Sequence, residues 1–118
     1  MTTSLERIRA AALELPGTEE RLSHGQPTFF VEGKQFAQFR DNHHGDGRTV
    51  VCVRVSGTDE QAMLIEADPA TYNKPAYLPS WVGINLAAAD VDWDLVGDRI
   101  AASWELAAPR RLLEAGGR

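Results

Sequence analysis

A glycine turn between two short β-forming runs constrains the fold more than any other feature of the sequence. Phe29–Val31 and Phe36–Arg40 contain strand-forming residues, and Glu32–Lys34 separates the two runs. Gly33 can adopt the positive φ that a tight turn needs. The stretch therefore predicts a β-hairpin, and we expect every other element to cover it.

Strand alternation predicts which side chains of the second hairpin strand lie together. Phe36, Gln38 and Arg40 would share one face, with Ala37 and Phe39 on the opposite face. The alternation between apolar and polar residues is imperfect here, so the strand prediction depends partly on the turn that precedes it.

The run Thr49–Val55 is the clearest single strand of the sequence. Its density of β-branched residues predicts a central position in a sheet, with Val51 and Val53 buried. Arg54 would face the other side of the strand, where it could join the polar face of the hairpin.

Helical and strand patterns occupy the rest of the chain. The predicted elements are a helix over Thr3–Leu15, a strand over Glu19–Ser23, a helix over Thr58–Ala67, a strand over Trp81–Leu86 and a helix from Asp90 or Asp92 to Ala107. This order, with hairpin-connected strands, predicts an α+β fold: a two-layer sandwich of an antiparallel sheet with helices packed on one face.

Local signals mark the ends of these elements. Thr3 with Glu6 has the spacing of a capping box, and so does Thr58 with Gln61. Asp68 followed by proline predicts one further helical turn. The prolines and tyrosines between this point and the strand at Trp81 predict an irregular loop.

Length and composition place the chain among ordinary globular proteins. Its 118 residues suit a single domain over 1–118, and 43% of them are hydrophobic while 25% are charged. The first fifteen residues form an amphipathic pattern and not a signal peptide, and no apolar run is long enough for a membrane span. The lone cysteine, Cys52, excludes an intramolecular disulfide, so we expect a cytoplasmic protein.

Five segments taken in order resemble a known family. They are Leu15–Glu20, His24–Phe29, Gly33–Ala37, Pro75–Val82 and Asp92–Leu106. Together these segments resemble the MmcQ/YjbR family of small bacterial proteins. The resemblance implies a fold similar to that of the frataxin-like CyaY proteins and a DNA-binding role, in which two hairpin or loop "wings" embrace the duplex.

In this sequence the wings correspond to Glu32–Lys34 and Asp41–Arg48. The candidate nucleic-acid-binding residues are Lys34, Gln38, Arg40, Arg48 and Arg54, since arginines bind phosphate groups through two parallel hydrogen bonds. The formal net charge of −5 opposes a polyanion, so any DNA binding should be weak and salt-sensitive. The alternative is a solvated sheet face with cross-strand ion pairs.

A second candidate site is the loop between the predicted helical turn and the last strand. Lys74, Tyr77, Ser80 and Trp81 combine hydrogen-bond donors with aromatic faces, and His24 could add an imidazole. Such a loop could bind another protein or a small molecule. It could equally be a packed corner, and His24 could be a structural histidine in a turn.

The sequence offers no strong catalytic or metal-binding motif. His43 and His44 lie near Asp41 and Asp46, but no further ligand stands at a recognised spacing, so we expect no metal and no cofactor. Cys52 lies within a strand, and nucleophile and nucleotide-binding fingerprints are missing from the sequence. We therefore expect a non-enzymatic binding module, with DNA as the partner that the resemblance implies.

Overall fold

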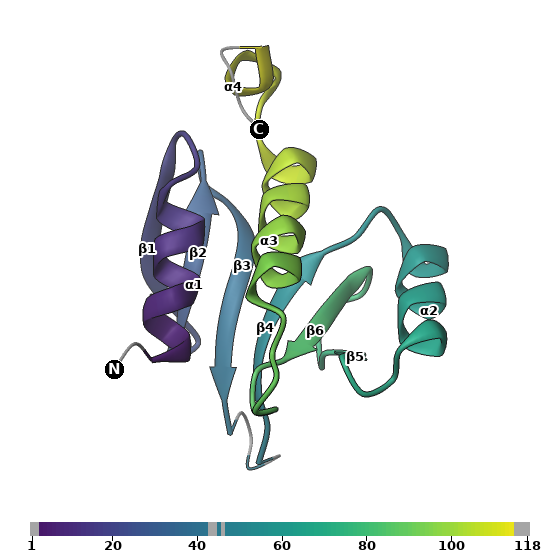
Figure 1. Ribbon diagram of the computed structural model, residues 1–118. Coiled ribbons are helices and arrows are strands. Elements are labelled where there is room, and N and C mark those ends of the chain that lie inside the picture. Colours follow the sequence, from purple (N-terminus) through teal and green to yellow (C-terminus); the bar gives the residue numbers. More distant parts are fainter. Residues whose placement is uncertain (1–2, 43–44, 46, 115–118) are drawn as a thin grey trace.

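A computed structural model describes residues 3–42, 45 and 47–114 of the chain (Figure 1). Its elements are α1 (Ser4–Leu13), β1 (Thr18–Ser23), β2 (Gln26–Val31), β3 (Lys34–Asp41), β4 (Thr49–Arg54), α2 (Thr58–Ala67), β5 (Tyr72–Asn73), β6 (Trp81–Asn85), α3 (Trp93–Ala107) and α4 (Arg110–Glu114). The strands form one antiparallel sheet in the order β1-β2-β3-β4-β6-β5.

Helices α1 and α3 cover one face of this sheet, and α2 lies beside its β5–β6 end (Figure 1). The predicted α+β fold class, an antiparallel sheet with helices on one face, is confirmed. Strand β4 lies between β3 and β6, and Val51 and Val53 are fully buried, as their β-branched sequence predicted.

The core between the two layers is built from helix stripes that the sequence had indicated. Val96, Ile100 and Trp104 of α3 are buried against the sheet together with Ile8 and Ala12 of α1. These side chains recur at helical spacing, so each helix buries one continuous apolar stripe. The indole of Trp104 also has its polar group satisfied, because Nε1 donates to the carbonyl oxygen of Pro16 at 3.0 Å.

Two of the predicted helix caps are confirmed and one is wrong, although the helix over Thr58–Ala67 has the predicted bounds. Thr3 and Glu6 form the expected capping box, and Asp92 caps α3 by accepting from two backbone N–H groups. Helix α2, however, starts after Gly57 and no side chain caps it. The predicted partner, Gln61, is instead buried, and its Nε2 donates to the carbonyl oxygen of Trp81 at 2.7 Å.

The segment after α2 begins as predicted and then differs from its prediction. Asp68 opens a single hydrogen-bonded turn: its carbonyl oxygen accepts from the N–H groups of Thr71 and Tyr72, and its side chain accepts from the Thr71 N–H at 3.3 Å. The chain then enters β5, a short strand where the prolines and tyrosines predicted an irregular loop. Pairing of Tyr72 with Ile84 of β6 extends the sheet at this edge.

A bulge in β3 changes the faces that simple alternation predicted. Phe29 pairs with Ala37, but the next residue, Phe30, pairs with Gln35, so Phe36 is the extra residue of the bulge. Phe36 is fully buried in the core beside Ala37, and the prediction that it shares a face with the polar residues of β3 is wrong.

The extra residue needs a hydrogen-bond partner outside the β-ladder, and Ser103 of α3 provides it. The Ser103 hydroxyl donates to the carbonyl oxygen of Phe36 at 2.5 Å and accepts from the backbone N–H of Arg54 at 2.8 Å. Ser103 is itself fully buried. One side chain therefore satisfies two backbone groups and links α3 to both β3 and β4.

Replacing this hydroxyl should destabilise the protein. We expect Ser103→Ala to lower the free energy of unfolding by about 1–3 kcal/mol, because the Phe36 carbonyl oxygen and the Arg54 N–H each lose the side-chain hydroxyl that they bond inside the protein. Urea denaturation followed by tryptophan fluorescence measures the change. The control Ala102→Ser, at an exposed position of the same helix, should stay within about 0.5 kcal/mol. Equal stability of Ser103→Ala and the unmodified protein would contradict the assigned role.

Candidate functional site

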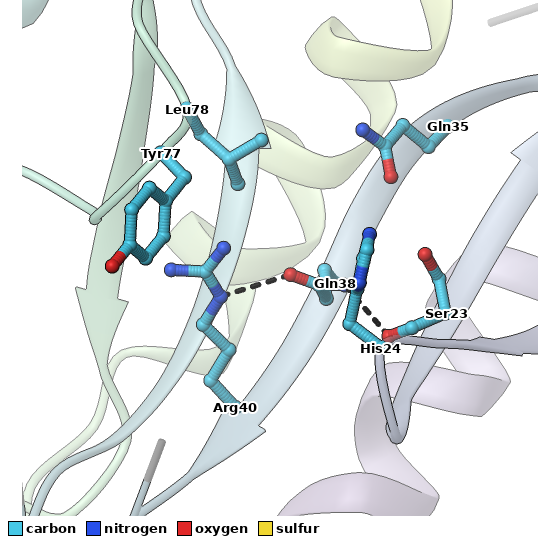
Figure 2. A pocket seen from close by; sticks show the side chains of 7 residues that line it. All are labelled: Ser23, His24, Gln35, Gln38, Arg40, Tyr77 and Leu78. Atoms are coloured by element: carbon cyan, nitrogen blue, oxygen red, sulfur yellow. Dashed lines mark hydrogen bonds between the residues drawn. The ribbon is translucent and has the colours of Figure 1, made fainter. Parts of the chain in front are cut away.

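A pocket opens on the sheet face opposite α1 and α3 (Figure 2). Its cavity has a volume of about 390 Å³. Three segments line it: the β1–β2 turn, strand β3, and the loop between β5 and β6. The lining side chains are Ser23, His24, Gln35, Gln38, Arg40, Tyr77 and Leu78.

The base of the pocket is a chain of buried polar side chains. Gln38 Oε1 accepts from Arg40 Nε at 2.9 Å, and Gln38 Nε2 donates to Thr28 Oγ1 at 3.0 Å. The Thr28 hydroxyl in turn donates to the carbonyl oxygen of Gln26 at 3.0 Å. Thr28 is fully buried, and Gln38 and Arg40 are 5% and 7% exposed. Each bond fixes the orientation of the next side chain, so the Arg40 guanidinium is held in place.

Arg40 also joins β3 to the opposite wall of the pocket. Its Nη1 donates to the carbonyl oxygen of Ala76 at 3.0 Å. Among the described residues Arg40 forms no ion pair. A guanidinium has five N–H donors, and the two bonds to Gln38 and Ala76 use two of them. Since Arg40 lines the pocket, the other three donors and the positive charge are available to a ligand there.

The β1–β2 turn forms one rim. His24 and Gly25 both have positive φ, 52° and 78°, as a two-residue type I′ hairpin turn requires. The turn follows β1 directly, so Ser23 and His24 stand beside Gln38, whose amide also donates to the Ser23 carbonyl oxygen at 3.4 Å (Figure 2). His24 is thus both a turn residue and a pocket residue.

The loop between β5 and β6 forms the other wall, and two of its residues have unusual backbone conformations. Tyr77 and Ser80 have φ values of 65° and 62°, a region that side chains other than glycine seldom adopt. Such residues each cost of the order of 1–3 kcal/mol and persist where surrounding bonds fix them. The Arg40–Ala76 bond and a bond from the Val55 N–H to the Ser80 carbonyl oxygen at 3.0 Å hold this loop.

Of the predicted loop site, the structure brings only part together. His24 and Tyr77 both line the pocket, from opposite walls, and Tyr77 is 82% exposed (Figure 2). Trp81 is instead buried against Val50 and Cys52, in agreement with the packed-corner alternative. Neither Lys74 nor Ser80 lines the pocket, and Lys74 borders a different cavity on the β5–β6 side.

The predicted nucleic-acid-binding residues are also divided. Gln38 and Arg40 lie together, but Lys34 begins β3 and Arg48 follows it, so the two wings stand at opposite ends of that strand. Eight residues of strand separate these ends by roughly 25 Å. In the first wing, Glu32 forms an ion pair with Arg111 of α4.

Arg54 lies on the same sheet face but outside the pocket. Its Nε donates to the carbonyl oxygen of Gln35 at 2.7 Å, and its guanidinium lies 5.1 Å from the centroid of the Trp81 ring. Burial lowers the pKa of Arg54 from its usual value, because the charged form loses contact with water. These contacts are typical of a partly buried arginine that packs against the sheet, and not of an exposed side chain that binds phosphate.

Sequence reasoning missed three lining residues, Ser23, Gln35 and Leu78. Gln35 was missed because the bulge places it, and not Phe36, on the face of Gln38 and Arg40. No local sequence signal marks the bulge. Leu78 lies between two prolines, where the sequence showed a constrained loop without indicating its direction.

Within the described residues, no group of three or more metal-ligating side chains is close enough to hold an ion. The histidines of the Asp41–Arg48 loop, His43 and His44, lie outside the described residues, as does Asp46. None of the described helices has the length and apolar character to cross a membrane.

The expectation that the protein holds no metal stays a prediction with a direct test. We expect EDTA to leave the melting temperature unchanged, because removing a bound metal would destabilise only a protein that folds around it. Differential scanning fluorimetry with and without the chelator measures this. A clear drop that one added metal reverses would show that the Asp41–Arg48 loop is a ligand set after all.

Comparisons with known proteins agree with the fold. The model of the family described as YjbR matches residues 13–106. The crystal structure of a Deinococcus radiodurans protein with a domain called DUF419 superposes with a TM-score of 0.74 at 19% sequence identity. The match covers 93% of this chain and 82% of that one, and at this identity it concerns the fold alone. A search of curated proteins finds no match.

Proposed function

The chain belongs to the YjbR family, and from that premise we propose that it is a non-enzymatic binding domain whose ligand is a small molecule. The ligand occupies the pocket formed by Ser23 and His24, the polar face of β3, and the Tyr77–Leu78 segment, which we call the Arg40 pocket. One observation carries the proposal: Arg40 is buried at the base of this pocket without an acidic partner among the described residues.

The size and composition of the Arg40 pocket support a small ligand. Its volume of about 390 Å³ falls in the range of small-molecule sites. Taking the share of one water in the liquid, about 30 Å³, as the space of one non-hydrogen atom gives a ligand of the order of ten such atoms. Tyr77 and Leu78 provide apolar surface, while Gln35 and Arg40 provide a few directed donors.

The chemistry of the same side chains favours binding over catalysis. A covalent mechanism needs a nucleophile, a base that contacts it and a third group that orients the base. Within the described residues no hydrogen bond joins the hydroxyl of Ser23 to the imidazole of His24. Amides and a guanidinium make up most of the remaining polar surface, and these groups bind and orient without exchanging protons near neutral pH.

Chemical-shift mapping tests the proposed function. In ¹H–¹⁵N spectra recorded with benzamide, benzoate, inorganic phosphate or glucose, we expect at least one probe to shift the backbone amides of His24, Gln38 and Tyr77 more than those of α2. Ser23→Trp, which places a large ring at the pocket rim, should weaken that response. The matched control Ser56→Trp adds the same ring at an exposed position outside the pocket lining. Absence of a localised response to every probe would overturn the proposal.

DNA binding through the two wings remains the second candidate, because the family resemblance implies it and Lys34 and Arg48 are both exposed. Burial of Arg40 removes it from the phosphate-binding set. Contacts from Lys34, Arg48 and Arg54 would give a slope of log K against log salt of about −0.9 per contact, so no steeper than about −3.

A labelled duplex titrated at two salt concentrations measures that slope. We expect weak, sequence-independent binding, and Lys34→Gln should reduce the magnitude of the slope by about 1. No binding at low salt would remove DNA as a partner. Tight binding at physiological salt with one preferred sequence would instead require base-edge contacts.

A further inference from the structure

The charge of Arg40 is the feature of the pocket that most narrowly defines a ligand. A buried charge is costly unless an opposite charge or a full set of hydrogen bonds compensates for it. Arg40 is 7% exposed, and its described partners are two neutral oxygens, one from Gln38 and one from Ala76. Three of its five N–H donors therefore remain for a ligand, together with the uncompensated positive charge.

We propose that the Arg40 pocket binds the carboxylate of a small organic acid, an inference that rests on the proposed small-molecule function. A guanidinium presents N–H donors in a planar fork, which matches the two oxygens of a carboxylate. Among the residues that the structure describes, no aspartate or glutamate lines the pocket, so no described lining residue repels a carboxylate or takes its place.

The amount of charge in the lining distinguishes a carboxylate from a phosphate. Arg40 is the only arginine or lysine among the described lining residues, which otherwise contribute amides, hydroxyls, one imidazole and one leucine. A single fixed cation matches one negative charge. A phosphate group with close to two negative charges at neutral pH would bring more charge into the pocket than the lining balances.

The hydrogen bonds that hold Arg40 preorganise its guanidinium for ligand binding. Gln38 holds Nε, Ala76 holds Nη1, and Thr28 in turn fixes the amide of Gln38. The side chain therefore has little conformational freedom left to lose when a ligand arrives, and loss of freedom is a main cost of binding. Gln38 acts here as a positioning residue, since its oxygen is already occupied by Arg40 Nε.

The other walls indicate an uncharged body attached to the carboxylate. Leu78 and the ring of Tyr77 stand on one side of the guanidinium, and Gln35 projects from β3 farther along the pocket (Figure 2). An apolar or aromatic body of a few atoms would contact Leu78 and Tyr77 while its carboxylate meets Arg40. The amide of Gln35 is placed to bond a polar substituent on that body.

Benzoate and benzamide test the inference, because they have nearly the same shape and differ in charge. By isothermal titration calorimetry at low salt, we expect benzoate to bind at least ten-fold more tightly than benzamide. Arg40→Met should weaken benzoate binding by about 10- to 100-fold, as the loss of a charge-assisted pair implies, and weaken benzamide binding by a smaller factor, because Arg40 also holds the Ala76 wall. Arg110→Gln, which removes one exposed positive charge of α4 outside the pocket lining, should not change either affinity.

Two further measurements keep the inference falsifiable if Arg40→Met does not fold. The comparison of benzoate with benzamide on the unmodified protein needs no variant, and Arg40→Lys keeps the charge while removing the fork, so it should weaken benzoate binding to an intermediate degree. Equal affinity for benzoate and benzamide would overturn the carboxylate inference and leave the small-molecule function standing. Tighter binding of inorganic phosphate than of benzoate would likewise overturn it.

A chain end could supply the same carboxylate, so one arm separates the two sources. The tripeptide Gly-Gly-Phe is compared with its amidated form. Stronger binding of the free-carboxyl tripeptide than of its amidated form and of benzoate would confirm the carboxylate and identify a polypeptide end as its source, whereas stronger binding of benzoate than of either peptide would identify a small free acid. If none of benzoate, benzamide, phosphate and peptide binds in the pocket, the proposed function fails together with this inference.

Discussion

The hydroxyl of Ser103 determines which residues of β3 face the helices and which face the pocket. A bulge inserts Phe36 between Gln35 and Ala37, and its carbonyl oxygen, displaced from the ladder, accepts from Ser103. In a strand, a shift by one residue moves every later side chain to the other face. By holding the bulge, α3 keeps Phe39 in the core and leaves Arg40 to the opposite face.

The two faces of β3 are stabilised by different interactions. On the helix side the contacts are apolar, and burial of large side chains such as Phe36 and Trp104 removes hydrocarbon from water. On the pocket side the buried side chains are polar. Thr28, Gln38 and Arg40 are connected by a series of hydrogen bonds, and each bond satisfies a group that is shielded from water. Removing one member leaves its neighbours unsatisfied, so the polar side has narrower tolerance for substitution than the apolar side.

Local signals predicted much of the fold, but only some residues of the candidate site and not their grouping. Gly33 marked the hairpin turn and the capping residues marked two helix starts, because each acts within a few residues. The bulge could not be predicted from local signals, because its hydrogen-bond partner Ser103 lies 67 residues from Phe36 in the sequence. Sequence reasoning named Arg40 and Tyr77, but assigned them to different sites, because only the folded sheet places them around one cavity.

Arg40 connects ligand recognition to the shape of the pocket. The guanidinium that faces the cavity also donates to the Ala76 carbonyl oxygen, one residue before the positive-φ conformation of Tyr77. That backbone conformation is unfavourable by itself, so the bond from Arg40 is part of what maintains the wall. A ligand that draws the guanidinium toward itself must either share it with Ala76 or displace that carbonyl. The conformation of the Ala76–Tyr77 wall and the position of the Arg40 guanidinium are therefore coupled, and substitutions at Arg40 affect both.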